Sequence, residues 1–381
     1  MPFLGEYTSL GNLGSGGFAE VFKVRHNQLG YVRAIRVLSQ IIDSEKSDIY
    51  RKFIQECKVL LRLGNGNHPN IIHIYRPYLK EQKAFVEMDY IDGCNIFDYV
   101  AINGGFVEID EIFQFTKEIS SALSYCHHDI YEYCMDADFD NLQTDPNDGT
   151  HFMIDKKKEE ELVQKYKVIH NDMHPGNVMR RKNGGYVLLD FGLSIEGNSV
   201  VVSSKRTNGA IEYKAPEKWD KDIITEQSDI YGFGCILYMM LTGKPPFPAA
   251  NPDSFSTQKD LYEAHKYKTP PAIFELRKAS FEKKYHKPYQ QDYPNWLEEM
   301  VMKCLAKSSN ERYSNGKELH DVFVKNYIEY GKTMTSGHVF DDAKYYEMQL
   351  TITKLTTALK NSQQEVRCLL ESLRRIKKRK F

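Results

Sequence analysis

The sequence predicts an α+β protein in two lobes, with a small strand-rich front and a larger helix-rich back. Residues 7–38, 71–79 and 83–90 have the β-branched, aromatic and alternating pattern of strands. Residues 95–128 and 226–328 instead carry apolar residues at helical spacing. A group of strands followed by a group of helices is typical of the α+β class.

The front part is expected to begin with a hairpin and to end in a helix. Residues 21–24 follow a run of glycines, a turn is predicted at Asn27–Gly30, and Tyr31–Leu38 alternates again. Residues 45–63 change to helical spacing with one apolar face. The following Gly64-Asn65-Gly66 run is expected to end that helix.

Composition excludes several classes of protein. The 381 residues are 41% apolar and 27% charged, which excludes wholesale disorder, and 51 Lys+Arg against 52 Asp+Glu give no general basic field for nucleic acid. Seven widely spaced cysteines without a Cys-x-x-Cys pair indicate reduced thiols and no metal framework. No basic segment followed by an apolar segment opens the chain, so we do not expect a signal peptide, and the longest apolar stretch, Ile230–Leu241, is too short to span a bilayer. We therefore expect a cytoplasmic protein without a transmembrane segment.

Two segments depart from the pattern of a compact domain. Residues 129–167 hold 11 Asp/Glu against 5 Lys, which predicts an acidic surface insertion. From residue 345 onward, apolar residues recur at alternating steps of three and four, as in a heptad repeat. We expect a coiled coil over residues 338–381 that pairs with a second copy or with a partner helix, although the same spacing also fits a helix docked on the protein.

The chain ends in a basic tail, with six Lys/Arg in residues 374–381. Such a tail fits a nuclear address, an anionic membrane, a nucleic acid or a solvated helix end, and nothing in the sequence selects among these.

A glycine-rich turn lies between the first two predicted strands. Its residues are Gly14, Ser15, Gly16, Gly17, Phe18, Ala19, Glu20 and Val21. Glycines let the backbone approach an anion closely and present N–H groups to phosphate oxygens. A dinucleotide-binding fold would open a helix at the third glycine, whereas here a strand continues.

A more specific signal is the run His170-Asn171-Asp172-Met173-His174-Pro175-Gly176-Asn177, followed by Asp190-Phe191-Gly192. Phosphoryl transfer requires a carboxylate that accepts a proton from the attacking hydroxyl, and oxygen ligands that hold Mg²⁺ against the phosphates. Asp172 fits the first task, while Asn177 and Asp190 fit the second.

With these motifs the sequence resembles the eukaryotic-type protein kinases over about residues 7–328. The matching features, in order, are the glycine loop, Glu56, the catalytic loop at 170–177, the D-F-G at 190–192, Ala215-Pro216-Glu217, Asp229 and Arg312. The resemblance implies the bilobal protein-kinase fold, ATP and Mg²⁺ as cofactors, and a protein substrate. It places an N-lobe at residues 1–90 and a C-lobe at residues 91–330.

The resemblance also implies roles for residues outside these motifs. Val21, Ala34 and Met179 would enclose the adenine, Met88 would be the gatekeeper, Asp89 to Ile91 the hinge, and Asn95 a ribose contact. Leu60, His170 and Phe191 would form part of the regulatory spine, and Glu217 would pair with Arg312. For Leu60 and Met179, core packing alone is an equally good account.

The first departure from the family is Arg36, which stands where the family carries a lysine on its third strand. An arginine keeps the positive charge and can pair with Glu56, but its longer forked head reaches into the volume of the phosphates. Lys23, on the neighbouring strand, is an alternative source of the charge.

Three further departures concern the catalytic loop and the segment after D-F-G. Asn171 replaces the arginine that reads a phosphate in this segment, so we expect activity to depend little on phosphorylation of Ser199, Ser203, Ser204 and Thr207. His174 replaces a lysine, where it would orient the loop or stabilise the transferring charge. Ala210 replaces a threonine of the Ser/Thr kinases.

The leading hypothesis is an ATP·Mg-dependent protein kinase that acts on Ser/Thr hydroxyls. A pseudokinase or scaffold is the alternative, because of Arg36, Asn171 and Ala210. A third possibility is a small-molecule phosphotransferase, since the catalytic loop is also similar to those of enzymes that modify aminoglycosides and choline. The Ala215-Pro216-Glu217 motif and the helical residues 255–328 argue against the third.

Overall fold

This computed structural model describes residues 5–15, 19–40, 42, 47–64, 67–80, 82–134, 156–197, 211–220, 223–249 and 254–333. Contacts divide the chain into two units, the first of Met1–Tyr133 and Val163–His320, the second of Cys134–Leu162 and Asp321–Phe381. The predicted strand-rich part and the predicted helix-rich part up to His320 belong to the first unit. The predicted coiled coil over 338–381 lies outside the described residues.

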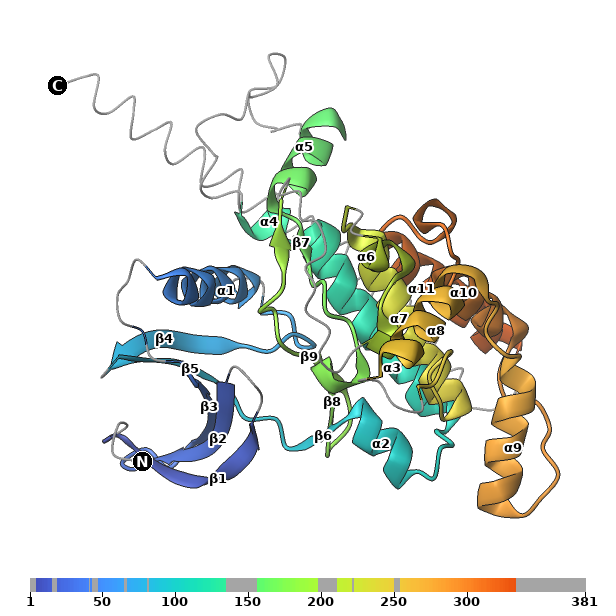
Figure 1. Cartoon of the computed structure of the whole chain (residues 1–381), viewed down its shortest axis with the longest axis horizontal. Coiled ribbons are helices and arrows are strands. Elements are labelled where there is room, and N and C mark those ends of the chain that lie inside the picture. The colour runs from blue at the N-terminus through green and yellow to red at the C-terminus, as the bar shows by residue number, and fades with distance from the viewer. Residues whose placement is uncertain are drawn as a thin grey trace. The chain divides into compact units, whose positions relative to one another are not determined.

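The strand-rich part is one antiparallel sheet of five strands, in the order β1-β2-β3-β5-β4 (Figure 1). The strands are β1 Tyr7–Ser15, β2 Ala19–His26, β3 Val32–Leu38, β4 Ile74–Lys80 and β5 Lys83–Asp89. The prediction of strands at 71–79 placed the start of β4 too early. Ile71 forms a parallel bridge with Leu188 in the helical part, and the N–H of Ile72 donates to the Leu188 carbonyl at 3.0 Å.

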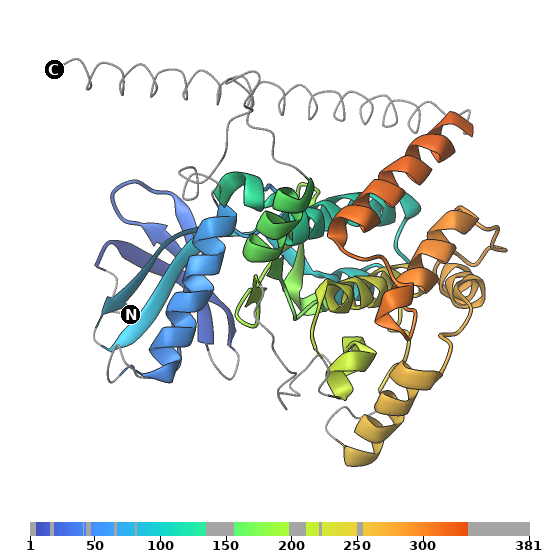
Figure 2. The ribbon, with the colours of Figure 1, turned by 90° about the horizontal axis from the view of Figure 1, so that it is seen from above.

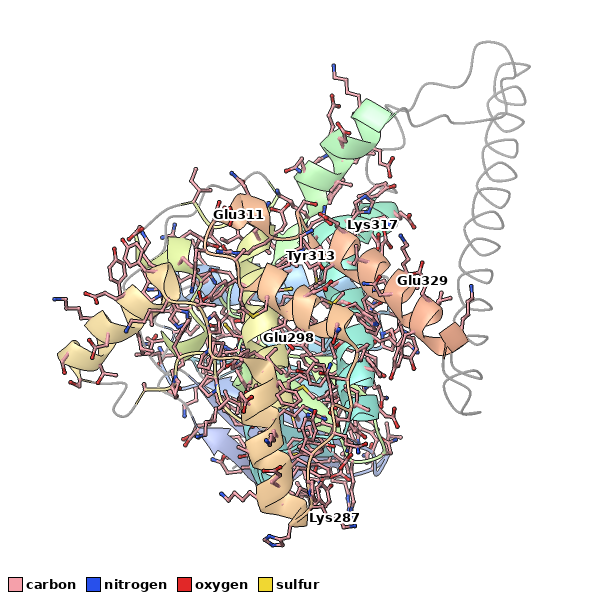
Figure 3. All side chains as sticks on the ribbon, turned by 90° about the vertical axis from the view of Figure 1, so that its right-hand side faces the viewer. Lys287, Glu298, Glu311, Tyr313, Lys317 and Glu329 are labelled. Atoms are coloured by element: carbon pink, nitrogen blue, oxygen red, sulfur yellow. The ribbon has the colours of Figure 1, made fainter. Side chains whose placement is uncertain are left out.

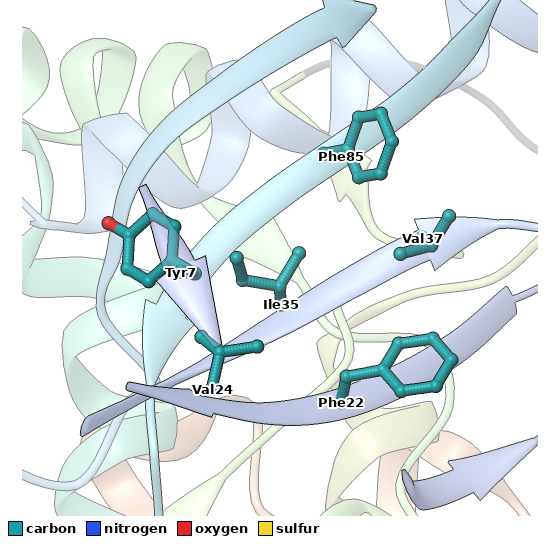
Figure 4. Packing of buried hydrophobic residues seen from close by; sticks show 6 residues of the cluster. All are labelled: Tyr7, Phe22, Val24, Ile35, Val37 and Phe85. Atoms are coloured by element: carbon teal, nitrogen blue, oxygen red, sulfur yellow. The ribbon is translucent and has the colours of Figure 1, made fainter. Parts of the chain in front are cut away.

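The two faces of this sheet carry different residues: one forms an apolar core, and the other carries residues predicted to bind the nucleotide. Directly opposed residues of antiparallel strands point to the same face. Phe22 lies opposite Ile35, and both join the buried cluster of Tyr7, Val24, Val37 and Phe85 (Figure 4). The intervening positions put Val21 opposite Arg36 and Ala34 opposite Met88. Val21, Ala34, Arg36 and Met88, all predicted nucleotide-binding residues, therefore share the face opposite to the apolar core.

Helix α1, Asp48–Gly64, packs against β4 and β5 (Figures 1 and 2). It confirms the helix predicted at 45–63. Its apolar side buries Phe53, Cys57, Leu60 and Leu63. Glu56 lies on the same side and is 9% exposed, so its carboxylate requires a partner within the protein.

The other helices are α2 Ile96–Ile102, α3 Ile109–Ser124, α4 Tyr131–Cys134, α5 Lys156–Tyr166, α6 Pro216–Trp219, α7 Glu226–Thr242, α8 Phe255–Tyr267, α9 Ile273–Tyr285, α10 Asn295–Cys304 and α11 Gly316–Thr333. A π-helical turn, Tyr125–Asp129, continues α3. Strands β6 Gly93–Asn95, β8 Val178–Arg181 and β9 Tyr186–Leu188 form a small sheet, and β7 Val168–Ile169 pairs with β10 Ile195–Glu196. The acidic insertion is helical at both ends, in α4 and α5, and residues 135–155 are outside the described part.

Helix α7 lies at the centre of the helical part, and every residue from Ser228 to Thr242 is buried. Its glycines allow close packing against neighbouring backbone. A Cβ added at Gly232 would lie 2.6 Å from the carbonyl oxygen of Met173, a distance that real Cβ atoms do not reach. Gly232 therefore lets α7 support the catalytic loop directly. The apolar stretch Ile230–Leu241 belongs to this helix, and none of the helices in the described residues has the length and apolar run that a membrane crossing requires.

Candidate functional site

Asp229, near the start of α7, holds the catalytic loop of residues 170–177. Its carboxylate is fully buried and accepts hydrogen bonds from the backbone N–H groups of His170 (2.6 Å) and Asn171 (2.7 Å). Burial alone would raise the pKa of this carboxyl, but the hydrogen bond from His127 and nearby positive charge keep it below its usual value. The loop is therefore anchored on a buried carboxylate that stays ionised.

His127 completes this anchor from the π-helical turn after α3. Its Nδ1 accepts the N–H of Gly316 at 3.0 Å, so the ring proton is on Nε2, which lies 3.1 Å from the Asp229 carboxylate. Such π-helical turns are frequent at functional sites. His127 could not be identified as a site residue from the sequence, because no motif marks it.

Asp172 and Asn177 are brought together within the loop. The Asn177 amide nitrogen donates to the Asp172 backbone carbonyl at 2.9 Å and to its carboxylate at 3.1 Å. Because the amide nitrogen of Asn177 donates both bonds, its amide oxygen is the atom that could serve as a cation ligand. The spacing of five residues across a short 3₁₀ turn, Pro175–Asn177, produces this arrangement.

His174 lies beside Asp172. Its Nδ1 accepts the N–H of Gly176 at 3.1 Å, and its Nε2 is 3.7 Å from the Asp172 carboxylate. Burial would raise the pKa of Asp172, but the hydrogen bond from His174 and the nearby His170 and Lys218 side chains outweigh that effect and lower it. Asp172 is therefore an ionised carboxylate near neutral pH, as an acceptor of a hydroxyl proton must be.

Lys218 is a residue of this site that the sequence analysis missed. Its ammonium donates to the backbone carbonyl of Asn171 at 2.7 Å, next to Asp172 in the chain. Burial lowers its pKa, while Asp229 and Asp172 oppose that shift. Lys218 follows Glu217 on the short helix α6, and only its position after this motif could have drawn attention to it.

A second group of charges is formed by Arg36 of β3, Glu56 of α1 and Asp190. The Arg36 guanidinium is paired with the Glu56 carboxylate, and its Nη1 lies 4.0 Å from the Asp190 carboxylate. Burial raises the pKa of Glu56 and Arg36 opposes this shift. Burial would lower the pKa of Arg36, but both carboxylates raise it, so the guanidinium keeps its charge. The predicted pairing of Arg36 with Glu56 is present.

Asp190 occupies a left-handed backbone conformation, with φ of 53°, that aspartate adopts only occasionally. Its carboxylate accepts the N–H of Gly192 at 3.1 Å. A Cβ at Gly192 would lie 3.0 Å from the Asp190 carboxylate and 3.3 Å from that of Glu56. Glycine at this position therefore lets the two carboxylates approach Arg36 together.

Hydrogen bonds at Leu189 join the two groups of charges. Its N–H donates to the Asn177 carbonyl at 2.8 Å, and its own carbonyl is 2.7 Å from the His170 ring. Because Leu189 directly precedes Asp190, the catalytic loop and the D-F-G segment are held side by side. Asn177 and Asp190, the two predicted metal ligands, flank this junction.

The donor set fits a magnesium ion that shares its coordination with phosphates. Asp190 is 48% exposed on its side chain, and Asn177 offers an amide oxygen. The described residues hold no cluster of three or more His, Cys, Asp or Glu side chains that could form a complete metal cage. Mg²⁺ in phosphoryl-transfer sites is usually held by one or two protein oxygens together with substrate phosphates and water, which is the case these residues fit.

The residues predicted to enclose the adenine come from two sheets. Val21, Ala34 and Met88 lie on one face of the large sheet, and Met179 of β8 is paired with Asn95 of β6. The Asn95 side-chain oxygen accepts the N–H of Asp98 at 2.9 Å and so caps α2. This oxygen therefore stabilises the start of α2, and the predicted ribose contact of Asn95 stays a prediction.

The hinge and the glycine loop are described only in part. Asp89 ends β5, where its N–H donates to the His73 carbonyl at 3.0 Å, and Ile91 follows without regular structure. Gly14 and Ser15 end β1 and Ala19 begins β2, while the loop residues 16–18 lie outside the described part. The Lys23 ammonium lies 4.0 Å from the centre of the Tyr90 ring at the hinge, and Arg36 is the residue paired with Glu56.

Two further contacts expected from the sequence are present. The His170 and Phe191 rings meet edge to face with centroids 4.7 Å apart. Arg312 forms a bidentate pair with Glu217 at 2.8 and 2.9 Å, and its side chain is fully buried. Glu311 and Tyr313, its neighbours in the chain, are labelled in Figure 3.

A protein kinase domain is matched over residues 7–134 and 131–327. The chain belongs to the protein kinase family. The fold described above is the bilobal kinase fold, with the five-stranded sheet and α1 as the N-lobe and the helical part as the C-lobe.

Similarity to individual kinases is modest but extends over most of the chain. It is 26% identical over 317 residues to a probable serine/threonine-protein kinase of Clostridium acetobutylicum, covering 82% of this chain and 39% of the relative. It is 25% identical over 349 residues to the serine/threonine-protein kinase PknB of Mycobacterium leprae, covering 90% of this chain and 46% of PknB. The chain thus spans less than half the length of these curated relatives.

Proposed function

We propose that the chain is an ATP·Mg-dependent protein kinase that transfers the γ-phosphoryl group to Ser or Thr hydroxyls of proteins. The observation that carries this proposal is the junction at Leu189. It brings the ionised Asp172 close to Asn177 and Asp190, which we propose as oxygen ligands of Mg²⁺, next to the Arg36–Glu56 pair. A chain that only folds has no need of this combination of groups.

In the proposed reaction, the Asp172 carboxylate orients the substrate hydroxyl and accepts its proton. The hydroxyl oxygen forms a bond to the γ-phosphorus while the bond from that phosphorus to the β-phosphate oxygen breaks, releasing ADP. Arg36 supplies positive charge toward the α- and β-phosphates, and Glu56 fixes its direction. Asn177 and Asp190 would hold Mg²⁺, which neutralises charge on the phosphates.

Two observations bear on the alternatives. Arg36 is engaged with Glu56 as the lysine of the family would be, which supports catalysis over a pseudokinase or scaffold. The bidentate Glu217–Arg312 pair braces the segment that precedes α7 and supports a protein substrate rather than an aminoglycoside or choline. The preference for Ser/Thr rests on the names of the relatives, because Ala210 and the segment 198–210 lie outside the described residues.

Transfer from radiolabelled Mg·ATP should be measured on generic protein acceptors, such as casein and histone, and on kanamycin and choline. We expect label on protein, and in phosphoserine or phosphothreonine after hydrolysis. Label on a small molecule alone would contradict the proposal, and label only on tyrosine would contradict its Ser/Thr part.

We further propose that residues 338–381 form a coiled coil that joins two copies of the chain, as their heptad pattern supports. This would raise the effective concentration of one kinase domain near another. A chain ending at residue 335 should then sediment as a monomer and the full chain as a dimer, and an unchanged state of association would refute the idea.

A further inference from the structure

The segment after D-F-G is tied to α1 by a carboxylate. Glu196, in β10, accepts a hydrogen bond from the Gln55 amide at 2.7 Å and forms an ion pair with Arg62. The side chains of Arg62 and Glu196 are only 24% and 23% exposed, so solvent screens this pair less than it screens a surface pair.

The two contacts are well placed to fix α1. Gln55 and Arg62 are seven residues apart, or two helical turns, and so lie on the same side of the helix about 10 Å apart along its axis. Holding two points two turns apart fixes both the rotation of a helix and its position along the axis. Glu56 directly follows Gln55, so the direction of its carboxylate toward Arg36 depends on this rotation.

Glu196 itself is held in place by the backbone around it. Strand β10 pairs with β7, and Ile195 is buried with Ile169 and Ile224. The next residue, Gly197, donates its N–H to the Lys167 carbonyl at 2.8 Å. It has a φ of 56°, and a Cβ there would lie 2.5 Å from the Lys165 carbonyl oxygen, so a glycine is required.

The same segment is held at a second point, near its start. Asn171 directly precedes Asp172, and its side-chain amide donates a hydrogen bond to the Leu193 carbonyl at 2.9 Å. It occupies a left-handed conformation with φ of 63°. Residues 190–197 are therefore anchored to the catalytic loop, to β7 and to α1 by hydrogen bonds and an ion pair.

We propose that Glu196 is a positioning residue of the phosphoryl-transfer reaction. Its carboxylate holds α1 so that Glu56 meets Arg36, and the site is assembled without a phosphate on residues 198–210. This inference rests on the proposed kinase activity, and it assigns to Glu196 a charge that phosphorylation of that segment would otherwise supply.

The test uses three variants of the full chain: Glu196→Gln, Arg62→Glu, and a double variant that carries both Glu196→Arg and Arg62→Glu. Lys58→Ala, an exposed position of α1, is the matched control. We expect Glu196→Gln to lower kcat for protein phosphorylation about tenfold, because one charge-assisted hydrogen bond is lost. The double variant should recover most of the kcat that Arg62→Glu loses. Unchanged kcat in Glu196→Gln, or a double variant no better than Arg62→Glu, would overturn the proposal.

A second readout does not depend on activity. Hydrogen exchange of the amides of residues 48–64 should become faster in Glu196→Gln than in the native chain and the Lys58→Ala control, while the unfolding midpoint changes little. If the native chain transfers no phosphate, the proposed function fails, and the exchange experiment still decides whether Glu196 holds α1. Exchange equal to that of the native chain would refute this role.

A third measurement asks whether activity requires a phosphate on residues 198–210. Treatment with a phosphatase, and the variant with alanine at Ser199, Ser203, Ser204 and Thr207, should leave kcat within about twofold, less than the effect of one modest hydrogen bond. Loss of activity in either case would show that a phosphate, and not Glu196, completes the site.

Discussion

Replacing Asp172 with asparagine should lower kcat for phosphoryl transfer to protein by about 10²- to 10⁴-fold, the usual contribution of a general base. Asparagine is nearly isosteric and can still accept the bond from Asn177, but it cannot take up a proton. The KM for ATP should change little, because Asp172 acts on the hydroxyl rather than on the nucleotide. Initial rates at saturating ATP and protein substrate measure the effect.

The pH dependence of the native chain gives an independent check on Asp172. Its pKa in the folded protein is lowered, so the carboxylate is present above the ordinary aspartate pKa of about 4 and is lost only as the pH falls through the lowered value. This group should therefore cause no fall in kcat between pH 8 and pH 5. For the Asp172→Asn variant, the control is Asp110→Asn, which makes the same change of charge at an exposed position. A fall in kcat as large in Asp110→Asn as in Asp172→Asn would contradict the role of Asp172.

Replacing Arg312 with methionine should reduce the free energy of unfolding by about 3–5 kcal/mol, the usual cost of removing one partner from a buried ion pair. The Arg312 side chain is fully buried, and Glu217 is 11% exposed. Burial would raise the pKa of Glu217, but the Arg312 bond keeps it below its usual value, so the variant leaves a buried carboxylate without its cation. Denaturation in urea, followed by circular dichroism, measures the change.

Two variants make the Arg312 prediction specific. Combining Arg312→Met with Glu217→Gln should recover part of the loss, because the unpaired charge is then removed as well. Lys303→Met breaks an exposed pair with Glu318, and we expect it to cost less than about 1 kcal/mol. A loss from Arg312→Met no larger than that of Lys303→Met would contradict the account of the buried pair.

The parts of the site that lie within one short segment could be predicted from the sequence. Asp172 and Asn177 are five residues apart in one loop, so local geometry alone limits how far apart their side chains can be. The pairing of Arg36 with Glu56 and of Glu217 with Arg312 followed from the order of the kinase motifs. The alternation of residues 31–38 predicted a strand, whereas the assignment of its residues to the two faces of the sheet came from the observed register.

Contacts that depend on how distant elements meet could not be predicted. Lys218, His127 and Glu196 reach the catalytic loop or α1 from segments that carry no motif at those positions. The π-helical turn that turns His127 toward Asp229 has no sequence signal of its own. Gly232 offered a weak signal, because a glycine within an apolar helix often marks the close approach of another backbone.

The start of β4 was misplaced for a related reason. Ile71 and Ile72 are residue types typical of strands, and both pair with a strand. Their partner, however, is Leu188 of the C-lobe rather than a residue of the front sheet. Composition predicts an extended backbone and burial, whereas the identity of the partner is set by the packing of the two lobes.

The central claim is that Arg36 works as the cation of an active Mg·ATP site. The most direct test measures transfer of labelled phosphate from Mg·ATP to protein by the native chain and by Arg36→Lys, side by side. The account predicts transfer by the native chain, with a rate within about tenfold of that of the lysine variant. No transfer by the native chain, with transfer restored by Arg36→Lys alone, would contradict it.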